Sequence, residues 1–139
     1  MLQRELRGSD RGTALAYLRY VPDDALELLP EIMWLATDLG LAHEVRDSLM
    51  WISRKQLSPR LEALLPRLLD EADTDIAPYD LYRCYAEMLA HVQTWEPLRM
   101  LVDRALISPD EDIREVGGIF MRLHGPAARR GDVASLTRV

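Results

Sequence analysis

The side chains that could carry out acid–base, nucleophilic or metal chemistry are few and widely separated along this chain. Its three histidines, His43, His91 and His124, occupy different segments, and none belongs to a ligand pattern such as H-E-x-x-H. The single cysteine, Cys84, rules out an internal disulfide and indicates a reducing compartment. The sequence contains no phosphate-binding glycine loop and no nucleophile elbow. We therefore expect no enzymatic activity, no bound metal and no cofactor.

Carboxylates are the dominant ionisable groups. The chain has 23 acidic and 17 basic residues, for a net charge of -6. One stretch, residues 70–80, holds five acids and no base, namely Asp70, Glu71, Asp73, Asp75 and Asp80. Such a cluster would attract a basic protein partner, whereas the overall charge disfavours duplex DNA and anionic membranes. The alternative is that these five acids have no partner protein and simply form a solvent-exposed edge of the fold.

Two apolar patterns repeat along the chain and predict the elements that carry these side chains. Stripes spaced i, i+3, i+4, i+7, i+8 begin at Ala25, Leu61 and Leu98, with offsets of 36 and 37 residues. A second stripe spaced i, i+3, i+4, i+7 follows each of these. The second stripes are Val45, Ser48, Leu49, Ile52, then Leu81, Cys84, Tyr85, Met88, then Ile113, Val116, Gly117, Phe120. Both spacings are typical of amphipathic helices, and their interleaving indicates stacked helical hairpins with Cys84 in the core.

Proline, serine and glycine mark the expected helix boundaries. Pro22 and Pro78 are expected to open helices, and so are the pairs Ser58-Pro59 and Ser108-Pro109, in which serine would cap the helix. Pro30 and Pro66 fall inside first helices at a 36-residue offset, which predicts a shared bend. Gly117-Gly118 falls inside a helix, where close packing is the expected reason for it.

Two segments resemble HEAT repeats, LLPEIMWLATDLGLAHEVRDSLMWIS and ALISPDEDIREVGGIFMRL. The likeness lies in an LLP-type first helix, an acidic turn, and the pairs Val45-Arg46 and Ile113-Arg114 that open second helices; Leu81-Tyr82 departs from this pattern. The resemblance covers about residues 23–124. It implies an all-α fold, a short right-handed α–α superhelix (HEAT-like solenoid) of about three and a half helical hairpins.

The expected organisation is a single domain over residues 1–139. A half-repeat would span about residues 10–21, full repeats 23–54, 58–92 and 94–124, and a C-terminal tail 125–139. The first residues lack the apolar core of a signal peptide, and no apolar run is long enough for a membrane span. We therefore expect a cytoplasmic protein.

Second helices line the concave surface of such stacks, so their residues off the apolar stripe are the candidate binding residues. Trp51 and Tyr82 are the strongest candidates, because large aromatic side chains dominate interface energetics. Asp47, Arg83 and Glu87 lie on the same helices. The acids Asp70, Glu71, Asp73 and Asp75 form a second candidate surface. The alternative is that both rings pack against neighbouring helices.

These features favour a non-enzymatic protein-binding helical-repeat module with a basic protein as its partner. A narrower form, drawn from class analogy, is an immunity- or antitoxin-type inhibitor of a bacterial toxin domain. Two alternatives stay open: a nucleic-acid-binding HEAT-like protein of the DNA-repair type, and a subunit or scaffold of a larger complex.

Overall fold

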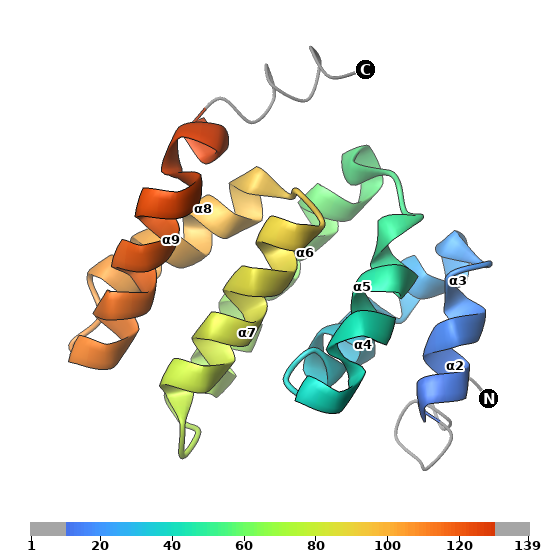
Figure 1. Ribbon diagram of the computed structural model, residues 1–139, viewed down its shortest axis with the longest axis horizontal. Coiled ribbons are helices and arrows are strands. Elements are labelled where there is room, and N and C mark those ends of the chain that lie inside the picture. Colours follow the sequence, from blue (N-terminus) through green and yellow to red (C-terminus); the bar gives the residue numbers. More distant parts are fainter. Residues whose placement is uncertain (1–10, 130–139) are drawn as a thin grey trace. The chain divides into compact units, whose positions relative to one another are not determined.

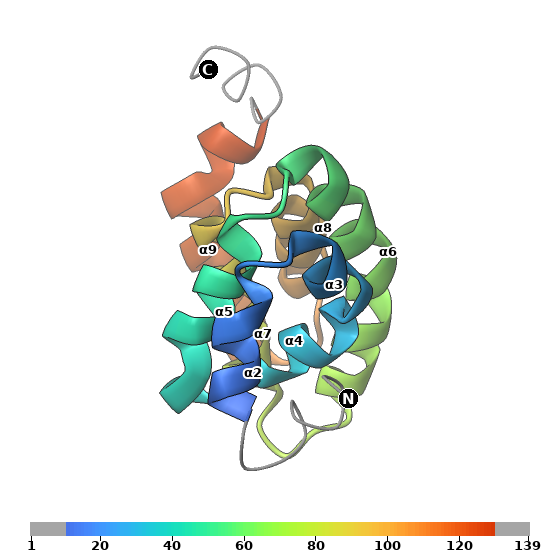
Figure 2. The ribbon, with the colours of Figure 1, turned by 90° about the vertical axis from the view of Figure 1, so that its right-hand side faces the viewer.

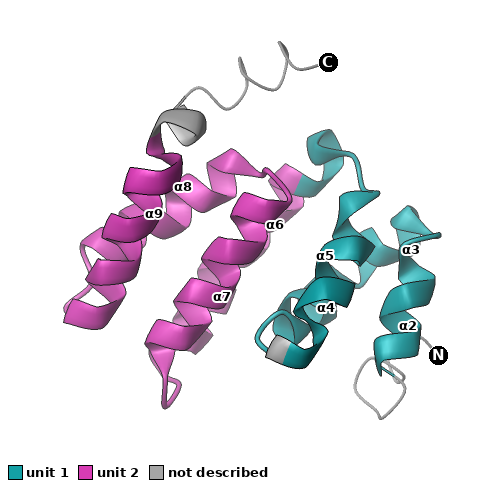
Figure 3. Cartoon of the chain, viewed as in Figure 1, with its two compact units in different colours: residues 1–57 teal, residues 58–139 magenta. Residues whose placement is uncertain are grey.

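The computed structural model describes residues 11–129, and their side chains as far as residue 125 with the exception of Leu39. Throughout this part the chain is helical and has no strand (Figure 1). The all-α class expected from the sequence is confirmed. The chain forms two compact units, unit 1 over residues 1–57 and unit 2 over residues 58–139 (Figure 3). Most of the expected tail, residues 130–139, lies outside the described residues.

Unit 1 is built from short helices. They are α2 (Arg11–Leu18), α3 (Pro22–Glu27), α4 (Leu29–Leu35), the 3₁₀ turn η1 (Leu39–Leu41) and α5 (Ala42–Met50). Helix α5 packs against α2, α3 and α4, which cover one side of it (Figure 2). The expected stripe of Val45, Ser48, Leu49 and Ile52 is buried, as predicted. The hydroxyl of Ser48 donates a 2.7 Å hydrogen bond to the carbonyl of Val45, so the stripe has no unsatisfied hydroxyl.

Pro30 lies in the first turn of a helix and not in its interior, contrary to the expected pair of matching bends. The chain leaves helical geometry at Leu28, and Pro30 is the second residue of α4. In the first turn of a helix the missing N–H of proline has no partner to lose, whereas an interior proline clashes with the preceding turn. Pro66, in contrast, lies inside the 20-residue helix α6 (Arg54–Asp73).

Unit 2 is built from longer helices. It contains α6 from residue 58 onward, α7 (Pro78–His91), α8 (Trp95–Leu106) and α9 (Glu111–Arg129). Helices α8 and α9 form the most extensive pair, and α7 packs against both. Helix α9 runs to Arg129, five residues beyond the expected end of the third repeat at residue 124.

Two of the expected helix starts are wrong. Helix α6 begins at Arg54 rather than at Ser58-Pro59, because the N–H groups of Gln56 and Leu57 donate to the carbonyl of Ser53. Helix α9 is capped by Asp110 rather than by Ser108, since the Asp110 carboxylate accepts a 2.9 Å hydrogen bond from the N–H of Asp112. Pro22 and Pro78 open α3 and α7 as expected.

Half of the stripe predicted for α7 lies in the core, since Tyr85 and Met88 are buried as expected. The buried residues are Tyr82, Tyr85, Ala86, Met88 and Leu89. Leu81 and Cys84, which the predicted stripe placed in the core, are only half-buried. The buried face is therefore displaced toward Tyr82, Ala86 and Leu89, and it keeps Tyr85 and Met88.

Gly117 allows α8 and α9 to approach each other closely. A Cβ at this position would lie 3.0 Å from the Cβ of Ala105 and 3.1 Å from the backbone nitrogen of Leu106. At Gly118 the nearest atom to such a Cβ would be Nη1 of Arg122, at an ordinary 3.5 Å. The expected packing role is therefore confirmed for Gly117. Within residues 11–129, no helix is long and apolar enough to cross a membrane.

Candidate functional site

The residues expected to bind a partner are divided between the two compact units. Asp47 and Trp51 belong to unit 1, at the C-terminal half and the end of α5. The others belong to unit 2, where Arg83 and Glu87 lie on α7. The acids 70–75 lie at the end of α6 and in the turn that follows it. Each unit therefore has to be considered as a candidate surface of its own.

In unit 1 a hollow of about 420 Å³ is lined by Arg19, Tyr20, Asp47 and Trp51. We call it the Trp51 hollow. Asp47 and Trp51 are four residues apart and therefore lie on one face of α5. Arg19 and Tyr20 follow the last residue of α2, in a turn closed by hydrogen bonds from the N–H of Tyr20 to Tyr17 and of Val21 to Leu18. The packing of α2 on α5 brings the two pairs together.

The lining of this hollow combines one positive and one negative side chain with two aromatic rings. The guanidinium of Arg19 lies over the ring of Tyr20, 4.7 Å from its centroid, and donates a hydrogen bond to the Tyr20 hydroxyl. That hydrogen bond, together with the nearby Asp47 carboxylate, raises the pKa of Arg19. On its other side, Asp47 lies 3.4 Å from Nε2 of His43. One carboxylate and one guanidinium therefore share a surface of aromatic rings.

The rings of this hollow are exposed to solvent. Trp51 is 68% exposed and Tyr20 is 69% exposed, so the alternative in which Trp51 packs inside the chain is wrong. Tyr17 and Met50, which neighbour the lining residues in the sequence, are also exposed. Exposed aromatic side chains that line one hollow are a common feature of binding sites.

Tyr82, the other aromatic candidate, is not a surface residue. Only 1% of it is exposed, and its hydroxyl donates a 2.8 Å hydrogen bond to Oδ1 of Asp73. Burial and this hydrogen bond raise the pKa of Tyr82 to about 12. The expectation that the ring is available to a partner is therefore wrong, because the buried face of α7 includes Tyr82.

Two of the acids expected to attract a partner are engaged within unit 2. Nη2 of Arg104 on α8 lies 2.7 Å from Oδ1 of Asp70 and 2.8 Å from Oδ2 of Asp73, and Nη1 lies 3.4 Å from the carbonyl oxygen of Pro66. With Tyr82 these groups join α6, α7 and α8, and we call them the Arg104 cluster. The cluster partly neutralises the acidic stretch, which weakens the case for an attractive edge at these two positions.

The remaining predicted residues lie on the surface of unit 2. Glu71 is exposed, and Asp75 accepts a 3.1 Å hydrogen bond from the N–H of Ala77 just before α7. Arg83 and Glu87 form an ion pair of 3.4 Å along α7. Exposed pairs of this kind contribute little to stability, so both side chains can exchange their partners at low cost.

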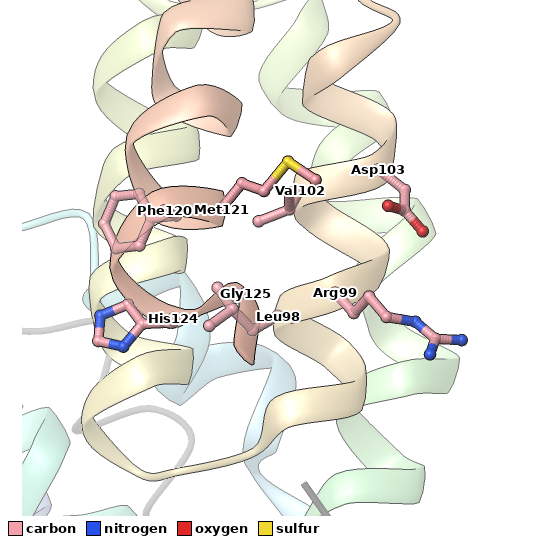
Figure 4. A pocket seen from close by; sticks show the side chains of 8 residues that line it. All are labelled: Leu98, Arg99, Val102, Asp103, Phe120, Met121, His124 and Gly125. Carbon is pink, nitrogen blue, oxygen red and sulfur yellow. The ribbon is translucent and has the colours of Figure 1, made fainter. Parts of the chain in front are cut away.

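A second hollow, which the sequence did not predict, lies between α8 and α9. Its volume is about 110 Å³, and Leu98, Val102, Phe120, Met121, His124 and Gly125 form its apolar wall (Figure 4). Arg99 and Asp103 stand on the α8 side. The ring of His124 stacks on Trp95 and Phe120, with centroids 5.8 and 6.0 Å away. This stacking gives His124 a packing role.

Sequence reasoning also missed Arg19 and Tyr20. Their contribution depends on the packing of α2 beside α5. They lie in the segment that was expected to form only a half-repeat, about residues 10–21. A local signal could have found them. Two tyrosines and an arginine lie within four residues, Tyr17, Arg19 and Tyr20, and both residue types are enriched in protein interfaces.

Neither a metal-binding cluster nor a thiol with a lowered pKa is found among the described residues. Within them, no group of three or more histidine, cysteine or acidic side chains could hold a metal ion. Burial raises the pKa of the Cys84 thiol, and raised pKa values make thiols less nucleophilic at neutral pH. Comparison with known proteins adds no assignment: no protein-family model, no curated protein and no solved structure matches this chain.

Proposed function

We propose that this chain is a non-enzymatic protein-binding module and that its contact surface is centred on the Trp51 hollow. The single observation that carries the proposal is the exposure of Trp51 and Tyr20 around a hollow that also holds Asp47 and Arg19. An indole ring left 68% in water forgoes stabilisation of roughly 1.5–3 kcal/mol that its burial would provide. A partner that covers the ring would recover this stabilisation.

The architecture that we propose for this module is a HEAT-like right-handed solenoid. The support comes from the repeated spacing of the apolar stripes and from two second-helix stripes that are buried as expected, those beginning at Val45 and Ile113. The long antiparallel hairpin of α8 and α9 is the kind of unit from which such stacks are built.

A basic protein is the partner that we propose. The net charge of -6 favours one, and Asp47, Glu71 and Asp75 present carboxylates on the surface of the chain. The narrower proposal, a cytoplasmic inhibitor that masks a basic toxin domain, rests on class analogy alone. Nucleic acid fits the surface less well, because Arg11, Arg83, Arg99 and Arg104 are each paired with a carboxylate of the chain itself.

Affinity capture from the native host with three forms of the chain tests the proposal. These are the wild type, Trp51→Ala, and Trp34→Ala, a matched control because Trp34 is a 56% exposed tryptophan of the same unit on α4. We expect a protein that the wild type and Trp34→Ala retain and that Trp51→Ala loses. If no protein depends on Trp51, or if nucleic acid is retained instead, the proposed function is wrong.

A further inference from the structure

The Trp51 hollow has one aromatic ring that carries a cation of the chain, that of Tyr20, and one aromatic residue that is mostly exposed to solvent, Trp51. Arg19 covers the ring of Tyr20 at 4.7 Å. The ring of Trp51, the best type of aromatic partner for a cation, remains 68% exposed on the other part of the lining. The chain thus shows, with its own Arg19, the interaction that a second guanidinium could make on Trp51.

The carboxylate needed to hold such a cation lies on the same helix face. Asp47 is one helical turn before Trp51, and its side chain is 40% exposed. A guanidinium is planar, so it can stack on a ring while its edge donates two parallel hydrogen bonds to a carboxylate. A lysine ammonium can make only one of these contacts with good geometry.

We propose that the Trp51 hollow binds an arginine side chain of the partner, stacked on the indole of Trp51 and paired with the carboxylate of Asp47. This inference rests on the proposed function for the existence of the partner, and it adds the chemistry by which the partner is recognised. The volume of about 420 Å³ leaves room for a side chain of this length beside Arg19. The negative net charge of the chain favours the approach of an arginine-bearing surface.

A peptide titration followed by NMR tests the proposal without the natural partner. The probes are acetyl-Gly-Gly-Arg-Gly-Gly-amide and the same peptide with citrulline, which keeps the shape of arginine but is neutral. The readout is the set of indole N–H signals of the ¹⁵N-labelled full chain, assigned with Trp34→Phe, Trp51→Phe and Trp95→Phe. We expect the arginine peptide to shift the Trp51 signal selectively and to bind about two- to fivefold more tightly than the citrulline peptide.

Two carboxylate variants locate the charge partner. Asp47→Asn should reduce the affinity for the arginine peptide by about two- to fivefold, as expected for an exposed ion pair. Asp23→Asn, which removes an exposed carboxylate of α3 in the same unit, should leave that affinity unchanged. Equal binding of both peptides, or equal effects of both variants, would overturn the proposal. A third peptide carries glutamate in place of arginine. If only this peptide shifts the Trp51 signal, the proposal is also overturned, because Arg19 would then be the anchor.

The failure of this proposal can be distinguished from the failure of the proposed function. If capture finds a protein that depends on Trp51 but the arginine peptide does not bind, the function holds and the arginine assignment is wrong. If the peptide binds as described but capture finds no protein that depends on Trp51, the site chemistry holds and the proposed function is wrong.

Discussion

The two units differ in how far they expose their aromatic side chains. Among the described residues, unit 1 exposes Tyr17, Tyr20, Trp34 and Trp51, whereas unit 2 buries Tyr82, Tyr85 and Phe120 and leaves Tyr79 and Trp95 half-buried. Among the residues of unit 2 that the structure describes, the large apolar side chains that are exposed belong to Ile76, Ile107, Met121 and Leu123. Burial of aromatic rings stabilises a fold, while exposed rings have surface area left for a partner. We infer that aromatic binding capacity is concentrated in unit 1.

The polar contacts differ in a corresponding way. In unit 2 the Arg104 cluster joins three helices through Asp70, Asp73 and Tyr82. In unit 1 the pairing of Arg19 with Tyr20 is between sequence neighbours and lies on the surface. Charged groups fixed between helices support the fold, and charged groups at the surface can change partners. The contrast is one between these two clusters, because unit 1 also has an ion pair between elements, Arg11 with Asp38 at 2.7 Å, and unit 2 also has an exposed pair along one helix, Arg83 with Glu87.

Substitution by alanine should destabilise the fold strongly at Tyr82 and hardly at all at Trp51, and this is the largest difference in stability that we expect. Tyr82→Ala empties a buried site and removes a hydrogen bond to Asp73, and we expect it to lower the free energy of unfolding by about 3–5 kcal/mol. Trp51→Ala removes an exposed ring and should change it by less than about 0.5 kcal/mol. Urea denaturation followed by circular dichroism measures both. Similar losses for the two variants would break the distinction between the units.

Alanine at the two adjacent glycines of α9 should change stability in opposite directions. Gly117→Ala places a Cβ against Ala105 and Leu106, and we expect a net loss of about 1–2 kcal/mol. Gly118→Ala meets only ordinary contact and should gain about 0.5–1 kcal/mol from its better helix propensity. Thermal unfolding of the two variants compares them directly. A gain from both would show that α8 and α9 are less tightly packed than described.

Alkaline pH should act on the buried tyrosines of unit 2. The pKa of Tyr82 is raised from 10.0 to about 12, and burial likewise raises the pKa of Tyr85 to about 12. The protonated forms are favoured in the folded state, so their contribution to stability is complete below about pH 10 and is lost as the pH rises through about 12. We expect the free energy of unfolding to fall across this window, and to fall less steeply in Tyr82→Phe. Parallel curves for wild type and variant would contradict the role assigned to Tyr82.

Apolar spacing predicted the helical class and most of the core, but it did not determine the rotation of α7. The stripes beginning at Leu81 and at Tyr82 are both apolar at every position. The buried face that forms places the Tyr82 hydroxyl beside a residue of another helix, Asp73 at the end of α6, which supplies the partner that a buried hydroxyl needs. Local spacing contains no information about that partner.

The candidate site, like the core, could be predicted only where it depends on spacing within one helix. Trp51 and Asp47 could be placed on one exposed face because they are four residues apart, with Asp47 on α5 and Trp51 directly after its last residue. Arg19 and Tyr20 could not be added, because only the packing of α2 on α5 brings them there. Asp70 and Asp73 were expected to be available to a partner protein, because local spacing did not reveal their contact with Arg104. That residue is more than thirty positions away in the sequence.

The affinity of the captured partner for the wild type, Trp51→Ala and Trp34→Ala is the most direct test of the account. Isothermal titration calorimetry at constant salt should show a loss of about 2 kcal/mol or more for Trp51→Ala, about 30-fold in Kd. The Kd of Trp34→Ala should stay within about twofold of the wild type. A Trp51→Ala chain that is folded and binds with the wild-type Kd would contradict the claim that the Trp51 hollow is the contact surface.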